Sequence, residues 1–180
     1  MVEYTWYSLV EIADDLQQGD FIHDCPLVVP PSDFSDVEDL EFEINTIDSI
    51  ILSQSCDLVN GKTEIILVCA YYPLKTFLDR LKDQSVKNKR STIEDLRKGH
   101  FPSYHLLNKG DDIESLSDYQ VVDFRNVYGI KLEALKRHSA KFKKRYRLLP
   151  PYREHLSQAF ARYFMRVGLP QDLNLKNYEI

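Results

Sequence analysis

The densest group of polar and reactive side chains in the sequence follows directly after a run of three aliphatic residues at 50–52. A rigid strand ending at this point would present these side chains at the edge of a sheet, where they could contact a bound molecule. Cys56 offers a thiol nucleophile, and Asp57 offers a carboxylate beside it. The candidate catalytic and binding residues of this group are Ser53, Gln54, Ser55, Cys56 and Asp57.

A cysteine nucleophile requires a base that forms the thiolate. His105, on a predicted neighbouring strand, is the nearest candidate for this base, and His23 is the second. In the alternative interpretation, Cys56 is a small buried apolar side chain, and the neighbouring hydroxyl and carboxylate groups hydrogen-bond a turn. The sequence leaves both interpretations open.

A second polar group lies on the predicted strand at 119–128. Asp123 and Arg125 alternate there with Val122 and Phe124, and the period of two places the charged pair on the opposite face of the strand. The pair could line a groove. It could equally be an ion pair without a further role, which contributes little to stability when it is exposed.

A basic segment at 131–147 carries eight lysine and arginine residues and only one acidic residue. Such a segment could bind RNA phosphates, and Phe142 and Tyr146 within it could stack on unpaired bases. A solvated basic face and a surface for an acidic protein partner are the alternatives. The candidate phosphate-binding residues are Lys143, Lys144 and Arg145.

Composition and charge restrict the class of protein. The chain has 180 residues and a net charge of −5, with seven carboxylates between residues 33 and 48. No apolar run approaches the roughly 20 residues that span a bilayer, and the first seven residues do not resemble a signal peptide. Three cysteines without a CxxC pair favour reduced thiols in a cytoplasmic location. Metal-ligand, P-loop and dinucleotide-binding patterns are absent from the sequence, so we expect neither a metal nor a cofactor.

The first half of the chain predicts one short helix followed by strands. An S-x-x-E pattern beginning at Ser8 predicts a helix over 8–18, and strands are expected over 21–29 and 42–53. Asn60-Gly61 predicts a tight hairpin that returns as a strand over 63–72. The central strand should be the one that contains the aliphatic run, because such strands are buried on both faces.

The second half predicts a helical insertion, further strands and a final helix within a single domain. Ser91 should cap a helix inside the insertion, and Gly99 should end it. Apolar residues from Leu156 to Val167 recur at helical spacing after Pro150-Pro151, which predicts a helix that packs on the sheet. The predicted parts of the domain 1–180 are the helix 8–18, first strands 19–74, insertion 75–100, further strands 104–107 and 119–128 with the basic connector inside 101–149, and the C-terminal helix 150–168.

The order of these elements resembles that of the MazF/PemK family of toxins. The segments that carry the resemblance are Gly19–Ile22, Ser49–Ser53, the turn Asn60–Thr63, Glu64–Cys69, Phe101–Leu107, Tyr119–Ile130 and the helix Tyr152–Val167. The resemblance implies a mainly β fold with helices, of the α+β class: a small SH3-like barrel with a helical insertion and a C-terminal helix. It also implies cleavage of single-stranded RNA, a homodimer whose groove holds the RNA, and an acidic antitoxin partner.

The sequence departs from the family at the expected site. Family members carry Arg-Pro before the strand that resembles Ser49–Ser53, and a Thr or Ser at the end of the next strand; this chain has Ile47-Asp48 and Tyr71-Tyr72 there. In RNA cleavage of this kind the 2′-hydroxyl is the nucleophile, and the protein supplies a base, an acid and a cation. Arg125 is the best replacement for the absent arginine.

Two functions therefore remain as hypotheses. The first is an endoribonuclease-like toxin or defence effector that acts on single-stranded RNA. The second is a catalytically inactive barrel that binds regulatory proteins in bacterial stress responses or phage defence. Fold alone does not decide between them, because one fold supports many functions.

Overall fold

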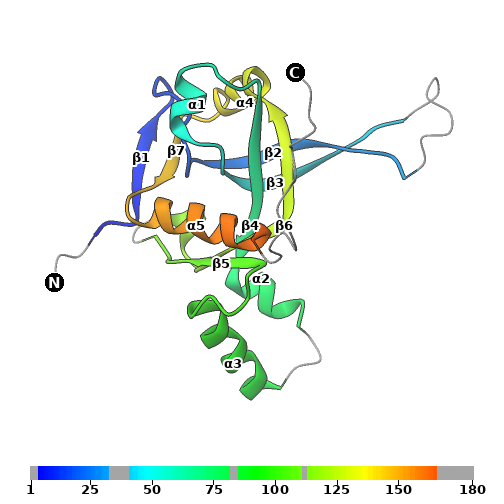
Figure 1. Cartoon of the computed structure of the whole chain (residues 1–180), viewed down its shortest axis with the longest axis vertical. Helices are drawn as coiled ribbons and strands as arrows, with labels where there is room; N and C mark the ends of the chain where they lie inside the picture. Colours follow the sequence, from blue (N-terminus) through cyan, green and yellow to red (C-terminus); the bar gives the residue numbers. More distant parts are fainter. Residues whose placement is uncertain (1–3, 33–40, 82–84, 111–112, 166–180) are drawn as a thin grey trace, which may run out of the picture.

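The computed structural model describes residues 4–32, 41–81, 85–110 and 113–165. Within these ranges the chain forms seven β-strands in two antiparallel sheets, together with five α-helices (Figure 1). The predicted α+β class is confirmed. No helix in the described ranges is long and apolar enough to cross a membrane.

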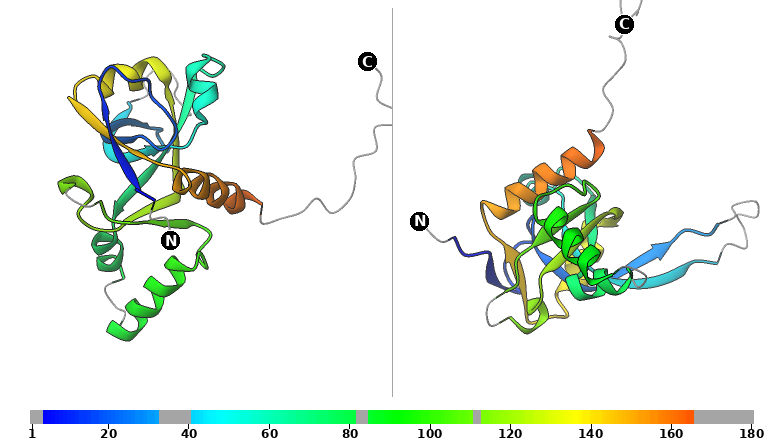
Figure 2. Two further views of the ribbon diagram at one scale, coloured as in Figure 1. Left: turned by 90° about the vertical axis from the view of Figure 1, so that its left-hand side faces the viewer. Right: turned by 90° about the horizontal axis from the view of Figure 1, so that it is seen from below.

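The larger sheet has five antiparallel strands in the order β2-β3-β4-β6-β5. β4 lies at its centre, and β3, which contains the aliphatic run, is an inner strand as well. β2 and β3 extend beyond the body of the protein as a two-stranded arm (Figures 1 and 2). The bounds, which agree with the predicted strands to within a few residues, are β2 Phe21–Val29, β3 Glu43–Ile51, β4 Ile65–Pro73, β5 Tyr104–Leu107 and β6 Gln120–Lys131.

The smaller sheet pairs β1 (Tyr7–Glu11) with β7 (Lys144–Leu148). The helix predicted over 8–18 is therefore wrong. Tyr7 and Val10 are buried in the strand conformation, and every residue of β1 has a partner in β7. The local capping signal is overridden because pairing with a distant strand buries these side chains and satisfies the backbone groups.

The two sheets meet at the start of β2. Asp20 forms an isolated antiparallel bridge with Arg147, and the Leu148 N–H donates to the Gly19 carbonyl at 2.9 Å. Gly19 has φ +85°, and a Cβ atom there would lie 3.1 Å from Leu148 Cβ, so the junction requires glycine. The strands of the described residues do not form a closed barrel.

α2, α3 and α5 lie where helices were predicted, whereas α1 and α4, the latter within the predicted basic connector, were not predicted. Ser85 rather than Ser91 caps the longer helix of the insertion, accepting from the Asn88 N–H at 3.3 Å, and Gly99 ends it with φ +70°. No tight hairpin forms at Asn60-Gly61, because α1 lies between β3 and β4 and ends at Val59 with Asn60 as its C-cap. The bounds are α1 Ser55–Val59, α2 Leu74–Asp79, α3 Val86–Arg97, α4 Leu132–Ser139 and α5 Tyr152–Phe164, with a 3-10 turn at Glu114–Leu116.

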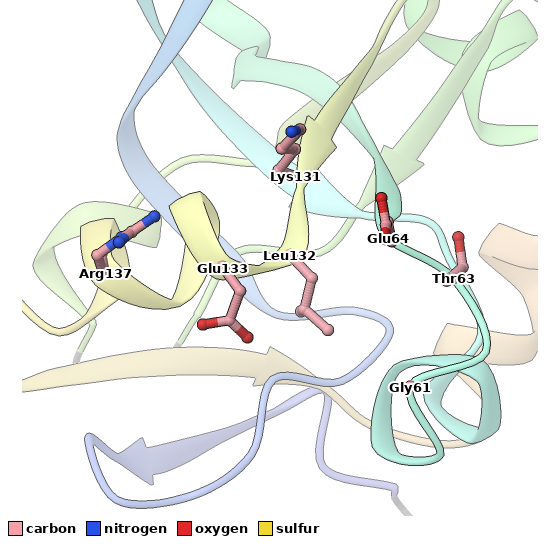
Figure 3. Close-up of a pocket in the computed structure, with 7 residues that line it drawn as sticks. All are labelled: Gly61, Thr63, Glu64, Lys131, Leu132, Glu133 and Arg137. Atoms are coloured by element: carbon pink, nitrogen blue, oxygen red, sulfur yellow. The ribbon is translucent and has the colours of Figure 1, made fainter.

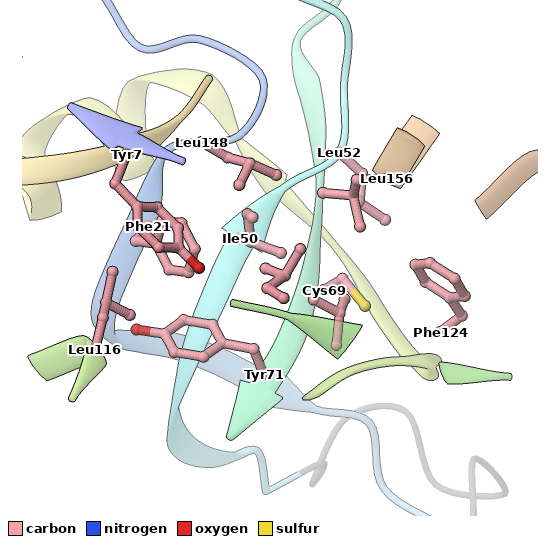
Figure 4. Close-up of a cluster of buried hydrophobic side chains, with 12 residues drawn as sticks. Tyr7, Phe21, Ile50, Leu52, Cys69, Tyr71, Leu116, Phe124, Leu148 and Leu156 are labelled. Carbon is pink, nitrogen blue, oxygen red and sulfur yellow. The ribbon is translucent and has the colours of Figure 1, made fainter. Parts of the chain in front are cut away.

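The apolar side chains form three clusters around the larger sheet. One joins the sheet, the β1-β7 pair and α5, and includes Phe21, Ile50 and Leu156 (Figure 4). The second lies under α4 and α1, and the third lies between the insertion helices and the β5-β6 pair. The predicted packing of α5 holds for Leu156 and in part for Phe160, whereas Phe164 is exposed; Val167 lies outside the described residues.

A buried ion-pair network holds the N-terminal segment against β7. The Asp20 carboxylate is fully buried and accepts from Arg145 Nε at 2.7 Å and from the Arg147 guanidinium. The Arg145 guanidinium also donates to the carbonyls of Glu11, Asp14 and Asp15. The segment between β1 and β2, which has no strand or helix of its own, thereby obtains hydrogen-bond donors for three carbonyls.

This network generates a stability prediction. Arg145→Met should lower the free energy of unfolding by about 3 kcal/mol, because a buried carboxylate and several carbonyls lose their donor. Lys143→Met, two residues earlier and exposed, should change it by less than about 0.5 kcal/mol. Urea denaturation followed by circular dichroism measures both values. Equal effects of the two substitutions would contradict the role assigned to Arg145.

Candidate functional site

The serines at 53 and 55 join α1 to distant segments of the chain. Ser53 Oγ accepts from the Leu67 N–H at 2.8 Å, and Ser55 Oγ accepts from the Gln18 N–H at 3.1 Å. These two hydroxyls therefore contact β4 and the segment before β2, and not the local turn between Leu52 and Asn60 that the alternative interpretation expected. Cys56 is exposed on α1, so the expectation that its side chain is buried is wrong.

Cys56 does not meet the histidine that was expected to activate it. Cys56 is on α1, which lies beside the start of β4 (Figure 1). His105 is on β5 and lies level with the other end of β4, because its partner Val122 on β6 also pairs with Tyr71. Cys56 Sγ lies 3.8 Å from Gln54 Oε1 and 3.7 Å from Asp57 Oδ1. Neither contact is with an imidazole, so the structure does not bring the expected base to this thiol.

Asp123 and Arg125 form a bidentate ion pair on β6. Arg125 Nε and Nη2 donate to the two carboxylate oxygens at 2.9 and 2.8 Å, and the Tyr72 hydroxyl donates to the same group at 3.1 Å. Burial alone would raise the pKa of Asp123, but the hydrogen bonds from Arg125 lower it below its ordinary value. Arg125 also lies over the Tyr104 ring at 4.7 Å. Its guanidinium is therefore held by the protein, which weakens its assignment as the substitute for the family's arginine.

The basic segment divides into a buried and an exposed part. Arg145, a candidate phosphate-binding residue, is buried against Asp20 and cannot contact RNA, which corrects that assignment. Alternation along β7 is the reason: Arg145 points into the protein, whereas Lys144 points out. Lys143 and Lys144 are exposed and keep the predicted capacity to bind phosphates.

His23 on β2 and Asp48 on β3 form a histidine–carboxylate pair between neighbouring strands. The register of β2 against β3 shifts between Ile22 and Cys25, and Asp24 within this bulge has φ +47°. His23 Nδ1 lies 3.3 Å from Asp48 Oδ1, and the Asp24 N–H donates to the same oxygen at 3.2 Å. A bulge changes the direction in which a strand side chain points, and here it brings an imidazole to a carboxylate.

The surroundings of this pair favour a charged imidazole. The hydrogen bond that His23 donates to Asp48 raises the pKa of His23 and outweighs the opposing effect of burial, and the same bond lowers the pKa of Asp48. The hydroxyl of Tyr71 lies 3.4 Å from His23 Nδ1. Burial raises the pKa of Tyr71, so its hydroxyl stays protonated at neutral pH.

The other ring nitrogen, His23 Nε2, has no hydrogen-bond partner within the described ranges. His23 lines a shallow hollow with Lys144 and Phe142, whose ring centroid is 6.5 Å from that of the imidazole. His138 Nε2 donates to the His23 carbonyl at 2.8 Å and fixes the backbone of the bulge to α4. An oriented imidazole, a cation and an aromatic ring thus share one small surface.

Only partial signals in the sequence indicated this pair of residues. His23 was the second candidate base, and Asp48 lies where MazF/PemK toxins carry Arg-Pro. Neither observation predicted that the two side chains would be in contact. The register shift that joins them depends on how β2 pairs with β3, which no short-range pattern encodes.

A larger hollow of about 480 Å³ lies between α4 and the turn after α1 (Figure 3). Lys131 and Arg137 line it together with Glu64 and Glu133, so it favours neither anions nor cations. Among the described residues, no group of three or more His, Cys, Asp or Glu side chains could hold a metal ion.

No family model matches the sequence, and no curated protein is significantly similar to it.

The His23–Asp48 pair predicts a pH-dependent contribution to stability. Because the pKa of His23 is raised on folding, the pair stabilises the protein below the unfolded value of about 6.5, and this contribution is lost as pH rises through the folded value. Asp48→Asn should lower the pKa of His23 in an NMR titration. Asp57→Asn, a carboxylate on α1 that contacts no histidine, is the control. An unchanged pKa in Asp48→Asn would contradict the pairing.

Cysteine accessibility gives a second prediction for this region. Cys25 and Cys69 are fully buried and Cys56 is exposed. Burial raises the pKa of the Cys69 thiol, which further slows its alkylation. Iodoacetamide added to the native protein should modify one thiol per chain, and Cys56→Ser should abolish the reaction. Mass spectrometry of intact protein measures the number, and two or more rapid modifications would contradict the burial.

Proposed function

We propose that the protein binds single-stranded RNA and cleaves it at the His23–Asp48 pair, as an endoribonuclease-like toxin or defence effector. The observation that carries the proposal is the orientation of His23 by Asp48 beside Lys144 and Phe142. Metal-free RNA cleavage requires a base near the 2′-hydroxyl and a cation near the phosphate. This surface has both, and an aromatic ring suited to base stacking.

In the proposed reaction, the 2′-oxygen attacks the neighbouring phosphorus atom and its proton passes to His23 Nε2. Asp48 holds Nδ1–H, so that the lone pair for this transfer is on Nε2. The ammonium group of Lys144 stabilises the negative charge of the pentavalent phosphorus. The 5′-oxygen leaves with a proton from water, and the proton on His23 Nε2 passes to the resulting hydroxide, which restores water and the neutral imidazole. The products are a 2′,3′-cyclic phosphate and a 5′-hydroxyl.

The fold supports this proposal through the order of its strands. We infer an open form of the small SH3-like barrel, in which the bridge from Asp20 to Arg147 joins the β1-β7 pair to the edge of the larger sheet. A helix that follows the last strand, as α5 follows β7, supports the resemblance to MazF/PemK toxins, and the α2–α3 insertion is an addition to the pattern of that family. His23 then replaces the absent family arginine as the main group at the site.

The same surface suits the expected partners. In the cytoplasm, an acidic antitoxin-like protein would cover Lys143 and Lys144 and exclude RNA. A homodimer would extend the RNA groove, because one shallow hollow contacts only a nucleotide or two. The antitoxin-like protein and the homodimer both depend on the nuclease proposal, and both would be rejected with it.

The β2-β3 arm supports a second candidate function, a protein-binding or regulatory module without catalysis. Val28 and Ile44 are cross-strand partners on the arm, and their side chains are 58% and 67% exposed. Phe42, two residues before Ile44, is exposed as well. Exposed apolar side chains that share one face of a sheet are typical of docking surfaces.

Cleavage of a mixed-sequence single-stranded RNA tests the first function. His23→Gln should lower the rate by about 100-fold or more, because the base is lost, and Lys144→Gln should weaken RNA binding. The wild-type rate should rise as pH rises through the pKa of His23, since only the neutral imidazole accepts a proton.

Lys62→Gln, an exposed lysine in the turn after α1, is the matched control for charge and should leave cleavage unchanged. Cys56→Ser should also retain activity. If the folded wild-type protein cleaves no RNA, the nuclease proposal fails and the regulatory module becomes the leading function. Cleavage that survives His23→Gln would reject the site.

A further inference from the structure

A hollow of about 640 Å³ lies between the C-terminal end of α3, the edge strand β5 and α5. In Figure 1, β5 runs between α5 and α3, and these three elements supply the walls. We call it the α3–β5–α5 hollow. It is at the opposite edge of the larger sheet from β2 and His23, because the strand order begins with β2 and ends with β5.

The charged groups around the α3–β5–α5 hollow are all basic. None of the described aspartates or glutamates lines it. Glu94, outside the lining, holds Arg97 at 2.9 Å and lies 4.0 Å from Lys98 Nζ, whereas Arg162 on α5 has no ion pair within the described part of the chain. The basic residues that line the hollow are Arg97, Lys98, His105, His155 and Arg162.

The imidazole of His105 reports the same excess of positive charge. Burial and, to a smaller extent, the neighbouring positive charges of His155 and Arg162 together lower the pKa of His105 to about 4. A carboxylate near these groups would act in the opposite direction. A bound anion would supply the negative charge that this part of the protein lacks.

Apart from Gln158, the remaining lining is apolar and aromatic. Phe101, Tyr104 and Leu106 from the β5 side face Ala159 of α5. The Tyr104 ring already has the Arg125 guanidinium near one face, and Phe77 meets it edge-on. Flat apolar walls beside a group of cations suit a ligand that combines a planar ring with phosphate groups.

We propose that the α3–β5–α5 hollow binds a small phosphorylated ligand with a planar ring, of the nucleoside diphosphate class. Arg162, His155 and Lys98 contact the phosphates, and the Phe101–Leu106 side of the hollow packs against the ring. The site is separate from the RNA surface at His23 and does not depend on the nuclease proposal.

Isothermal titration of the full chain with adenosine 5′-diphosphate at low ionic strength tests this site. We expect saturable binding, and a dissociation constant about tenfold larger for Arg162→Gln, because one charge-assisted contact is lost. Arg153→Gln, on the same helix but outside the lining and paired with Glu154, is the matched control and should bind like the wild type. Adenosine and pyrophosphate should each bind more weakly than the complete nucleotide.

Ring-proton NMR signals of His105 and His155 give a second readout, and both should shift as the diphosphate is added. Absence of saturable binding, equal binding by Arg162→Gln and the wild type, or unshifted histidine signals would overturn the proposal. Pyrophosphate binding as tightly as the nucleotide would overturn the part played by the ring. His23→Gln should leave nucleotide binding unchanged, so failure at one site is distinguishable from failure at the other.

Discussion

The buried carboxylate of Asp20 is the constraint on which the rest of the structure depends. A charge without water is tolerated only when it is paired and hydrogen-bonded, and here two arginines from β7 surround it. The Arg145 guanidinium also donates hydrogen bonds to three backbone carbonyls between the end of β1 and the start of β2. One interaction therefore fixes where β1, the entry into β2 and β7 lie relative to one another, across more than 120 residues of sequence.

This constraint also shapes the candidate site. With Arg145 directed inward, alternation along β7 leaves Lys144 on the outside, where it shares a hollow with His23. The bulge in β2 aims His23 at Asp48, and His138 of α4 holds the backbone of the bulge. The buried Asp20–Arg145 ion pair and the His23–Asp48 pair therefore lie close together, near the start of β2 and along β7.

The two proposed binding surfaces differ in their construction. The surface at His23 is shallow, and its main feature is one oriented imidazole beside a cation. The α3–β5–α5 hollow is larger, and its main feature is an excess of basic side chains over aromatic walls. The helical insertion is needed for the α3–β5–α5 hollow, because α3 forms one of its walls and β5 and α5 form the others. An insertion into a small β fold can add a ligand site without altering the original sheet.

The sequence by itself determined the α+β class, five of the strands to within a few residues, the helical insertion and the final helix, because these depend on local periodicity, proline and glycine. It also identified the exposed lysines and the Asp123–Arg125 alternation. Tertiary structure alone decided that residues 7–11 form a strand, that Arg145 is buried, that Cys56 and His105 lie apart, and that His23 meets Asp48. Each of these depends on pairing or burial between distant segments, and the free energy of those contacts exceeds the local preferences that a sequence displays.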